Sequence, residues 1–507
     1  MGLPAALGTS LAFMTSVVGL SLSEMIILKR RLHMPQEKQY AKSRLILYTV
    51  MIGAFMSMFD SGVVNVGLPV IAGQFRTDIN AVQWIASVYL LVMSALLPIL
   101  GTVADHFGRR KIYNTGFFVI SIFTLFCGFS ANLSMLIVMR ILQAVGGAMV
   151  MANGMAIATE NYPPSERGRN LGLLVTMMAI GSIAGPPLGG IAIGLWGWRS
   201  VFYLTFLVSI AGFIVSYISI PRDRKAREVG YRFDLVGSLS LVISVVTFIY
   251  GFSNVAVMGI RDPLVFMSIL VFAASFVLFI VIEKRKMHPV VHLDLFRNWV
   301  FSTSVVASLL SFVTMFASAV LIPFYYQKVL GISPQTAGLY MMAFPVAMAV
   351  VSPFSGSLSD KIGSAMLTTT RLVVNGMALI LLANINLQTP IVLILVYVGL
   401  MGLSLGLFQS PNNSSIMGSV PKNKLGAANG ITQLIKNIGM VIGIAFSVSL
   451  FTAFLGTSPI HDGPAFLQSA KYVYYMAAGL SFIGAMVSAV RNREFKKGAV
   501  KSGAKDI

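Results

Sequence analysis

The chain has 507 residues, of which 56% (about 284) are hydrophobic and only 11% are charged. A soluble globular protein carries charge on about a quarter of its residues, so this composition excludes the soluble classes. The single cysteine excludes a disulfide framework and any metal or cluster site built from cysteines. At roughly 20 apolar residues per crossing, the composition supplies about fourteen crossings and predicts an all-α, polytopic membrane protein.

Apolar runs separated by short polar loops predict fourteen core helices that cross the bilayer. In chain order, the expected spans are 45–72, 81–103, 112–131, 135–158, 171–194, 201–220, 234–253, 263–282, 299–324, 336–357, 366–385, 390–410, 426–453 and 472–490. A further apolar run precedes them at 2–28.

The N-terminal extension, 1–44, allows two interpretations. The run 2–28 is long enough to form an extra helix, although it contains Glu24. The Lys-Arg-Arg sequence at 29–31 would then hold its inner end in the cytoplasm and place the N-terminus outside. A signal peptide is not indicated, because no positive residue precedes the apolar part. Alternatively, translation starts at Met34, just before a polar stretch, and the sequence leaves both interpretations open.

Lysine and arginine are concentrated in alternate loops. Of the 37 such residues, 29 lie in the segments 29–44, 101–113, 160–170, 221–232, 283–297, 359–365, 421–425 and 491–507. The positive-inside rule predicts that these segments are cytoplasmic, so both ends of the core, including the basic tail 491–507, face the inside of the cell membrane. The formal net charge of +20 therefore follows from topology and does not indicate nucleic-acid binding.

A repeat divides the core into two halves. Residues recur after 255 or 258 positions: Gly101, Asp105 and Gly108 as Gly356, Asp360 and Gly363, and Pro163, Gly168, Gly172, Gly181 and Gly185 as Pro421, Gly426, Gly430, Gly439 and Gly443. The unit is six helices, which predicts six-helix bundles at 45–220 and 299–490 and an inserted helix pair within 221–298. Such parallel repeats are typical of transporters that bind substrate between their halves. Close helix packing alone would explain the glycines but not the repeated aspartate.

Several motifs resemble those of the major facilitator superfamily. The segment Gly-Thr-Val-Ala-Asp-His-Phe-Gly-Arg-Arg-Lys at 101–111 resembles the loop motif between its second and third helices, and Arg-Ile-Leu-Gln-Ala-Val-Gly-Gly at 140–147 resembles its fourth-helix motif. The glycines of 172–190 match the antiporter motif of its fifth helix. The segment 60–69 resembles the first-helix motif of the fourteen-spanner drug:proton antiporters. The resemblance covers about 45–490 and implies a multidrug efflux protein that works by alternating access.

The loop motif predicts a cytoplasmic gate made of Gly101, Asp105, Gly108, Arg109 and Arg110. A carboxylate at Asp105 can hold a cation or a helix N-terminus of a neighbouring span in one state and release it in another. The alternative is a simple turn that carries topological charges. The second copy of the motif has Ser364 and Ala365 after its glycine and so lacks the basic cluster.

The antiporter motif predicts close helix packing around the fifth span. Its positions here are Gly172, Gly181, Gly185, Pro186, Gly189 and Gly190. Glycines allow two helices to approach closely, and the Gly-Pro pair is expected to interrupt the helical hydrogen bonds and kink the span. That such a helix restricts proton leakage is implied by the resemblance alone, because packing by itself accounts equally well for the residues.

Asp60 is the only acid that lies well inside a core span, and we expect it to carry the transported proton. Its expected partner is Arg140 or Lys436, both of which also lie inside spans. A carboxylate beside a cation changes its affinity for protons when its surroundings open or close. The alternative is a static buried ion pair.

The substrate cavity is expected to include Asn65 and Gln143, which belong to two of the motifs, together with Lys436. Arg371 lies only five residues inside its expected span, so we expect its side chain to extend to the inner membrane surface. With a single acid in the core spans, neutral, zwitterionic or monovalent substrates are favoured.

The favoured function is proton-driven efflux of amphipathic organic compounds or drugs, with relatives of this type exporting dyes and antibiotics. A proton-coupled importer or uniporter on the same fold, or a non-transporting membrane sensor or enzyme, remains the alternative. No catalytic set stands at the required spacing, all five histidines lie in loops, and no phosphate-binding Gly-x4-Gly-Lys-Ser/Thr sequence is present. The expected partners are a small organic substrate, protons and the bilayer, with no cofactor, metal ion or nucleic acid, and the expected state is a monomer.

Overall fold

The computed structural model describes residues 35–160, 162, 164–220, 235–286, 292–421 and 424–503. The apolar run at 2–28 lies outside these residues, as does the loop at 221–232. Within the described residues, fourteen helices are long and apolar enough to cross a membrane. The expected all-α fold with fourteen spans is confirmed.

The N-terminal half contains seven helices that make six spans. They are α3 (Pro35–Gln74), α4 (Ile79–Val82), α5 (Trp84–Phe107), α6 (Arg109–Gly128), α7 (Leu133–Glu160), α8 (Pro164–Trp196) and α9 (Ser200–Ser219). The short α4 and the longer α5 together form the second span. An inserted pair follows, α10 (Leu235–Met258) and α11 (Pro263–Arg285).

The C-terminal half begins after the short 3-10 helix η1 (Leu293–Arg297). Its elements are α12 (Trp299–Ala319), α13 (Leu321–Phe324), η2 (Tyr325–Val329), α14 (Pro334–Met341), α15 (Ala343–Ile362), α16 (Ser364–Ala383), α17 (Ile391–Gly418), α18 (Leu425–Leu455) and α19 (Gly463–Gly503). The first three form one span, and α14 with α15 form the next.

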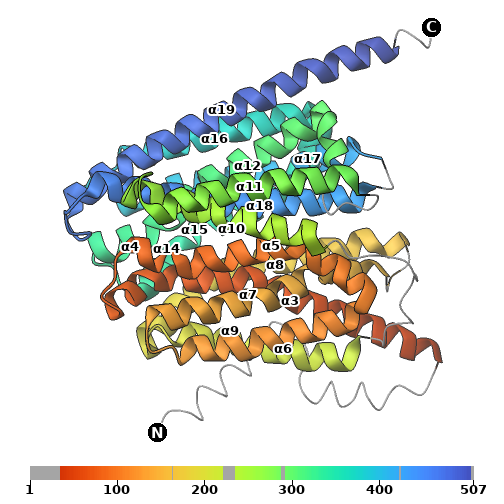
Figure 1. Ribbon diagram of the computed structural model, residues 1–507, viewed down its shortest axis with the longest axis horizontal. Helices are drawn as coiled ribbons and strands as arrows, with labels where there is room; N and C mark the ends of the chain where they lie inside the picture. Colours follow the sequence, from red (N-terminus) through yellow and green to blue (C-terminus); the bar gives the residue numbers. More distant parts are fainter. Residues whose placement is uncertain are drawn as a thin grey trace.

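Most span boundaries lie within a few residues of those expected, and two differ by more. The span expected at 390–410 continues to Gly418, and the last span begins at Gly463 and not at 472. Helix α19 also continues through most of the expected basic tail to Gly503, and Figure 1 shows its far end projecting beyond the bundle.

Local sequence signals explain several of these helix ends. The Asn298 side chain accepts hydrogen bonds from the backbone N–H groups of Val300 and Phe301 and so caps α12. Asp262 caps α11 in the same way and is followed by Pro263 at the first helical position. These caps satisfy N–H groups that would otherwise lack a partner at the membrane surface.

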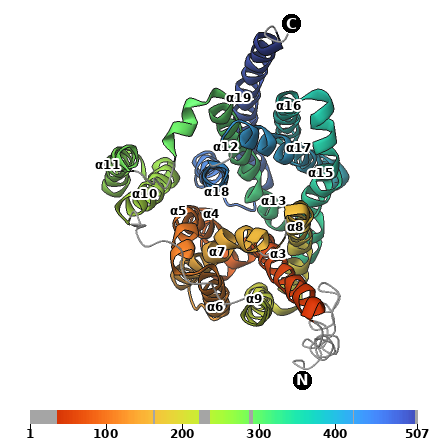
Figure 2. The ribbon, with the colours of Figure 1, turned by 90° about the vertical axis from the view of Figure 1, so that its right-hand side faces the viewer.

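The two halves repeat the same packing scheme. In the N-terminal half α3 packs on α8 and α6 packs on α9, and in the C-terminal half α12 packs on α18 and α16 packs on α19. Figure 2 looks along the bundle and shows the halves as two groups, with α10 and α11 at one side. The inserted pair contacts the core through α10, which lies against α18 and α5.

The repeated loop glycines adopt the same backbone conformation in both halves. Gly108 joins α5 to α6 with φ 102° and ψ 127°, and Gly363 joins α15 to α16 with φ 87° and ψ 140°. Residues with a Cβ rarely adopt such positive φ values. The 255-residue repeat therefore preserves a backbone turn that requires glycine.

Candidate proton and substrate site

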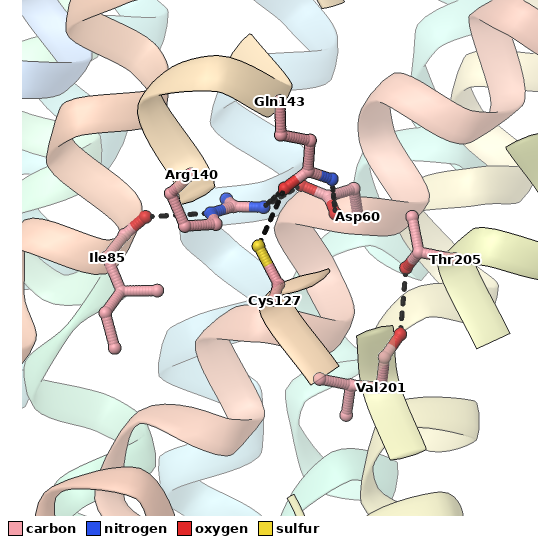
Figure 3. A network of polar contacts seen from close by, with 7 residues as sticks. All are labelled: Asp60, Ile85, Cys127, Arg140, Gln143, Val201 and Thr205. Atoms are coloured by element: carbon pink, nitrogen blue, oxygen red, sulfur yellow. Dashed lines mark hydrogen bonds and ion pairs between the residues drawn. The ribbon is translucent and has the colours of Figure 1, made fainter. Parts of the chain in front are cut away.

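A buried ion pair joins the first and fourth spans. The Arg140 Nη1 group on α7 donates a hydrogen bond to Asp60 Oδ2 on α3 over 2.8 Å. Only 1% of the Arg140 side chain and 2% of the Asp60 side chain are exposed. Of the two expected partners for Asp60, the structure therefore selects Arg140 (Figure 3).

Gln143 completes this pair as a bridging residue. It lies one turn after Arg140 on the same face of α7, as residues three apart do. Its Oε1 accepts a 2.8 Å hydrogen bond from Arg140 Nη1, and its Nε2 donates to Asp60 Oδ1 over 3.1 Å. Cys127 Sγ on α6 lies 3.8 Å from the same Gln143 Oε1. Gln143 therefore belongs to the ion-pair network, which fixes the carboxylate through both of its oxygens.

Helix α5 provides the remaining contacts of the guanidinium. Arg140 Nε donates to the backbone oxygen of Ile85 over 3.1 Å, as Figure 3 shows. The centroid of the Tyr89 ring lies 4.3 Å from the Arg140 Cζ atom, a cation–π distance. With Cys127 of α6, four spans thus meet at one network, so a change at Asp60 affects the packing of α3, α5, α6 and α7 together.

Asn65 lies one turn beyond Asp60, in a narrow space between the two halves. This space has a volume of only about 10 Å³. Arg140 and Tyr89 border it from the N-terminal half, and Phe316 and Ile444 border it from the C-terminal half. Arg140 therefore adjoins the interface between the halves.

A larger cavity of about 460 Å³ lies at one end of the bundle. We call this the basic end, because the loops rich in lysine and arginine are located there, and we call the other the opposite end. The cavity is lined by α3, α5, α6, α7 and α8 of one half and by α18 of the other. Its lining includes the amides Asn153, Asn429 and Gln433, the cations or titratable groups Arg109 and His292, and the methionines Met151, Met155 and Met178.

The cavity-lining amides were not identified from the sequence. Asn65, Gln143 and Lys436 are not among the described residues that line the cavity, whereas Asn153 and Gln433 are. The available signal was the presence of amide side chains inside strongly apolar spans, since such groups are expensive in a bilayer and tend to face a cavity.

Lys436 lies on α18 and away from Asp60. Its Nζ donates a hydrogen bond to Asn413 Oδ1 over 3.3 Å and lies 5.9 Å from the centroid of the Phe312 ring. Lys436 is 9% exposed, and its neighbours Gln433 and Leu434 line the cavity. Within the described part of the chain, no group of three or more His, Cys, Asp or Glu is placed to hold a metal ion.

The two halves contact each other at the opposite end. Gln327 Nε2 of the C-terminal half donates to the backbone oxygen of Val66 over 2.9 Å. Thr452 Oγ1 lies 3.1 Å from Asn80 Oδ1. At the basic end the cavity lies between the halves. The structure therefore has one closed end and one end that contains a cavity.

Two residues of the expected gate line this cavity. Gly101 and Arg109 line it. Arg110 Nη2 donates to the backbone oxygen of Tyr217 over 3.0 Å, close to the C-terminal end of α9, where a cation is favourable. Asp105 lies in the last turn of α5 and so precedes the loop, but its side chain is outside the described part of the structure. Its role in the gate stays a prediction.

An ion pair in the C-terminal half lies close in sequence to two cavity-lining residues, His292 and Ala427. Asp294 of η1 accepts a hydrogen bond from Lys424, the residue just before α18. This hydrogen bond holds the pKa of the Asp294 carboxyl below its usual range. The contact ties the connection after α11 to the start of α18, which lines the cavity.

The motif glycines of α8 separate into three groups. At Gly181, Gly185 and Gly189 an added Cβ would meet α3, through Phe55, Gly62 and Val63 respectively. At Gly190 it would run into Pro334 of α14, in the other half. At Gly172 it would meet no atom of a described residue within 4 Å. Pro186 lies inside the helix, and its backbone oxygen is the atom that a Cβ on Gly338 would meet.

The expectation that Arg371 extends to the membrane surface is wrong. Its side chain on α16 is 0% exposed, and its guanidinium lies 4.9 Å from the centroid of the Phe408 ring on α17. Depth along a helix does not determine the direction in which a residue points, and α16 directs Arg371 into the C-terminal half.

Comparisons with known proteins agree with this architecture. The family model described as Major Facilitator Superfamily matches residues 50–444 and 304–506. The riboflavin transporter RibZ of Clostridioides difficile is 30% identical over 458 residues, with 89% of this chain and 98% of that protein covered. The multidrug resistance protein Stp of Mycobacterium tuberculosis is 29% identical over 416 residues, with 82% of this chain and 77% of that protein covered.

Solved structures show the same fold at low sequence identity. A peptide transporter POT in complex with sulfate has a TM-score of 0.68 at 13% identity and covers 89% of this chain and 94% of its own. A bacterial homologue of the human lysosomal transporter Spinster, in an inward-facing and unoccupied conformation, has a TM-score of 0.65 at 16% identity. It covers 90% of this chain and 98% of its own.

Proposed function

The chain belongs to the major facilitator superfamily and is a transporter and not an enzyme; on that premise, we propose that it exports amphipathic organic compounds or drugs in exchange for protons. The observation that supports this most directly is the buried Asp60–Arg140 pair, held at 2.8 Å between two core spans. On insertion scales, placing a charged side chain at the centre of a membrane helix costs at least about 2.5–3.5 kcal/mol of free energy. A charged pair at this depth therefore needs a function or a compensating contact.

In the proposed cycle, Asp60 binds and releases the coupling proton. Protonation removes the negative charge that Arg140 Nη1 contacts, and it turns one carboxylate oxygen into a hydroxyl donor. The Gln143 amide, which contacts both residues, must then rearrange its hydrogen bonds. Because the network joins α3, α5 and α7, this rearrangement biases the packing of the N-terminal half between two states.

The cavity at the basic end is the proposed binding site for the exported compound. Three amide side chains supply hydrogen bonds, and methionine side chains supply an adaptable apolar wall. This combination suits amphipathic compounds of varied shape, and it favours neutral, zwitterionic or monovalent ones. Gly185 and the other packing glycines of α8 would hold the fifth span against α3 during the exchange.

We further propose that the basic end faces the cytoplasm, in agreement with the distribution of lysine and arginine. The cavity would then receive substrate from the cytoplasm or the inner leaflet, and the contacts of Gln327 and Thr452 would close the outer end. On this reading, Asp105 with Arg109 and Arg110 forms the cytoplasmic gate.

Import is the second candidate, because a relative at 30% identity is a riboflavin transporter. The same cavity could bind a planar, hydrogen-bonding compound and release it inward. Everted membrane vesicles with an imposed pH gradient, acid inside, distinguish the two functions. Exchange predicts that substrate accumulates in the acidic lumen and that its arrival raises the lumenal pH.

The vesicle assay uses fluorescent dyes, a panel of antibiotics and riboflavin, with vesicles from the same efflux-deficient host lacking the protein as control. Accumulation that requires the pH gradient supports exchange. Substrate movement that does not depend on the pH gradient contradicts exchange and favours uniport. Substrate movement only out of everted vesicles contradicts exchange and favours import.

A further inference from the structure

Arg371 is a buried cation whose hydrogen-bonding groups have no partner. Its Nε, Nη1 and Nη2 atoms make no hydrogen bond with any described residue, and the side chain is 0% exposed. Its guanidinium carbon lies 4.9 Å from the centroid of the Phe408 ring, a cation–π distance. A ring face attracts a cation but accepts none of its five N–H hydrogen bonds, so the guanidinium is left without an acceptor.

Two more unpaired donors lie on α12. Ser308 and Ser311 are both 0% exposed, and neither hydroxyl has a hydrogen-bond partner among the described residues. They are three residues apart and therefore share one face of the helix. A serine hydroxyl normally bonds back to its own helix or to a neighbour when buried, so two unpaired hydroxyls on one face are unusual.

One hydrogen bond links α12 and α16 close to the unpaired groups. One turn beyond Ser311 and Arg371, Asn375 Nδ2 of α16 donates to Thr314 Oγ1 of α12 over 3.1 Å. Ala307 and Leu372, the sequence neighbours of Ser308 and Arg371, lie in one buried apolar cluster, to which Ala485 of α19 also belongs. The two serines and the arginine therefore lie within about one turn of segments that meet in the interior of the C-terminal half.

The corresponding region of the N-terminal half has a carboxylate. There, between α3, α6 and α7, Arg140 contacts Asp60. The repeat pairs these helices with α12, α16 and α17, and none of those three contains an aspartate or glutamate. These three helices therefore bury an arginine in the C-terminal half without supplying an acid of their own as its counter-ion.

We propose that Arg371, Ser308 and Ser311 form a binding site for one monovalent anion, either a halide or a carboxylate group. All three side chains offer hydrogen-bond donors, and an anion accepts from every donor while compensating the charge. Water would satisfy hydrogen bonds but leave the charge uncompensated. The anion comes from one of two sources, a free ion in solution or the carboxylate of a transported compound. The site lies in the half that lacks Asp60 and does not depend on the direction of transport.

The test measures binding of labelled formate and labelled chloride to the purified full-length protein at constant ionic strength, with gluconate as the replacing anion. The wild-type protein is expected to bind one anion per chain in a saturable manner. Arg371→Met should lose this binding, and Ser311→Ala should weaken it at least tenfold. Lys436→Met is the matched control, because it removes the other buried cation of this half, and it should bind as the wild type does.

Thermal unfolding shows whether the variants are folded. Arg371→Met is expected to unfold in gluconate at a temperature at least as high as the wild type, because an uncompensated buried charge is replaced by an apolar side chain. Only the wild type and Lys436→Met should gain stability when chloride or formate is added. A gain of the same size in Arg371→Met, no binding of chloride, formate or benzoate to the wild type, or loss of binding in Lys436→Met would overturn the proposal.

The size of the anions that bind distinguishes the two possible sources. Binding of both chloride and formate identifies a site for a free ion. Failure of these two, together with saturable binding of labelled benzoate as the larger carboxylate, identifies a site for the carboxylate of a transported compound. Either result supports an anion site at Arg371, provided that Arg371→Met abolishes it.

Discussion

Gly185 of α8 and Gly62 of α3 face each other so closely that a Cβ on Gly185 would lie 3.0 Å from the Gly62 Cα atom. Ordinary carbon contacts at a Cβ are longer than 3.4 Å. The first and fifth spans therefore touch backbone to backbone, on the same helix that carries Asp60. Gly181 and Gly189 extend this contact by one turn on either side, against Phe55 and Val63.

We predict that Gly185→Leu reduces efflux to near the background of cells without the protein. A leucine side chain cannot fit between two touching backbones, so α8 must move away from α3. The measurement is dye efflux from intact cells at matched membrane expression. Gly185→Ala should retain part of the activity, since one methyl group requires a shift of only a few tenths of an ångström.

Gly172→Leu is the matched control, because Gly172 belongs to the same motif but a Cβ there meets no atom of a described residue within 4 Å. We expect it to export dye at the wild-type rate. Equal losses in Gly172→Leu and Gly185→Leu would show that the motif does not act through packing on α3.

Gly190 has a different neighbour and so a different expected effect. A Cβ there would run into the backbone oxygen of Pro334, across the interface between the halves. We predict that Gly190→Val weakens closure of the opposite end. The test uses a protein in which Cys127→Ser removes the native cysteine and Ser61→Cys introduces a new one at the narrow space beside Arg140. With Gly190→Val added, this cysteine should react with a maleimide supplied from the opposite end several-fold faster than it does without Gly190→Val.

The control for this measurement is Gly172→Val in the same background, which should leave the labelling rate unchanged. If Gly190→Val labels at the control rate, then closure of the opposite end does not depend on the contact between α8 and α14.

Replacement of Gly108 by alanine tests the repeated turn. The φ of 102° at this position is essentially restricted to glycine, so Gly108→Ala is expected to cost of order 1–3 kcal/mol in backbone strain. Gly363→Ala should cost a similar amount, because φ there is 87°. Gly101→Ala, in the same motif but inside α5 with nothing within 4 Å, should be neutral. The check is the thermal unfolding temperature of the three purified variants.

Much of the fold could be predicted because apolar runs and basic loops follow directly from the properties of the bilayer. The least accurate boundary was the start of the last span, at Gly463 and not at 472. Lys471 and the polar residues before it interrupt the apolar run. The helix nevertheless continues through them, because one face of this stretch, with Phe466 and Ala470, is buried against the protein.

The site could be predicted only in part, because sequence gives depth but not direction. Asp60 and two cations lie inside core spans, and the sequence could not select between Arg140 and Lys436 as the partner. The structure shows that Arg140 faces α3 while Lys436 contacts Asn413 and Phe312. The same uncertainty in direction explains the error at Arg371.

The central proposal is that Asp60 carries the coupling proton, and Asp60→Asn tests it most directly. Asparagine keeps the volume and a carbonyl that can accept from Arg140 Nη1, but it cannot exchange a proton near neutral pH. Asp60→Glu keeps the carboxylate and is the matched control, expected to retain part of the activity with an altered pH dependence.

The decisive measurement is substrate accumulation in proteoliposomes driven only by an imposed pH gradient, with substrate binding measured on the same purified protein. The account predicts that Asp60→Asn still binds substrate but shows no accumulation above that of protein-free liposomes. Accumulation by Asp60→Asn against a substrate gradient, at a rate near that of the wild type, would contradict it and leave Asp60 as a structural partner of Arg140.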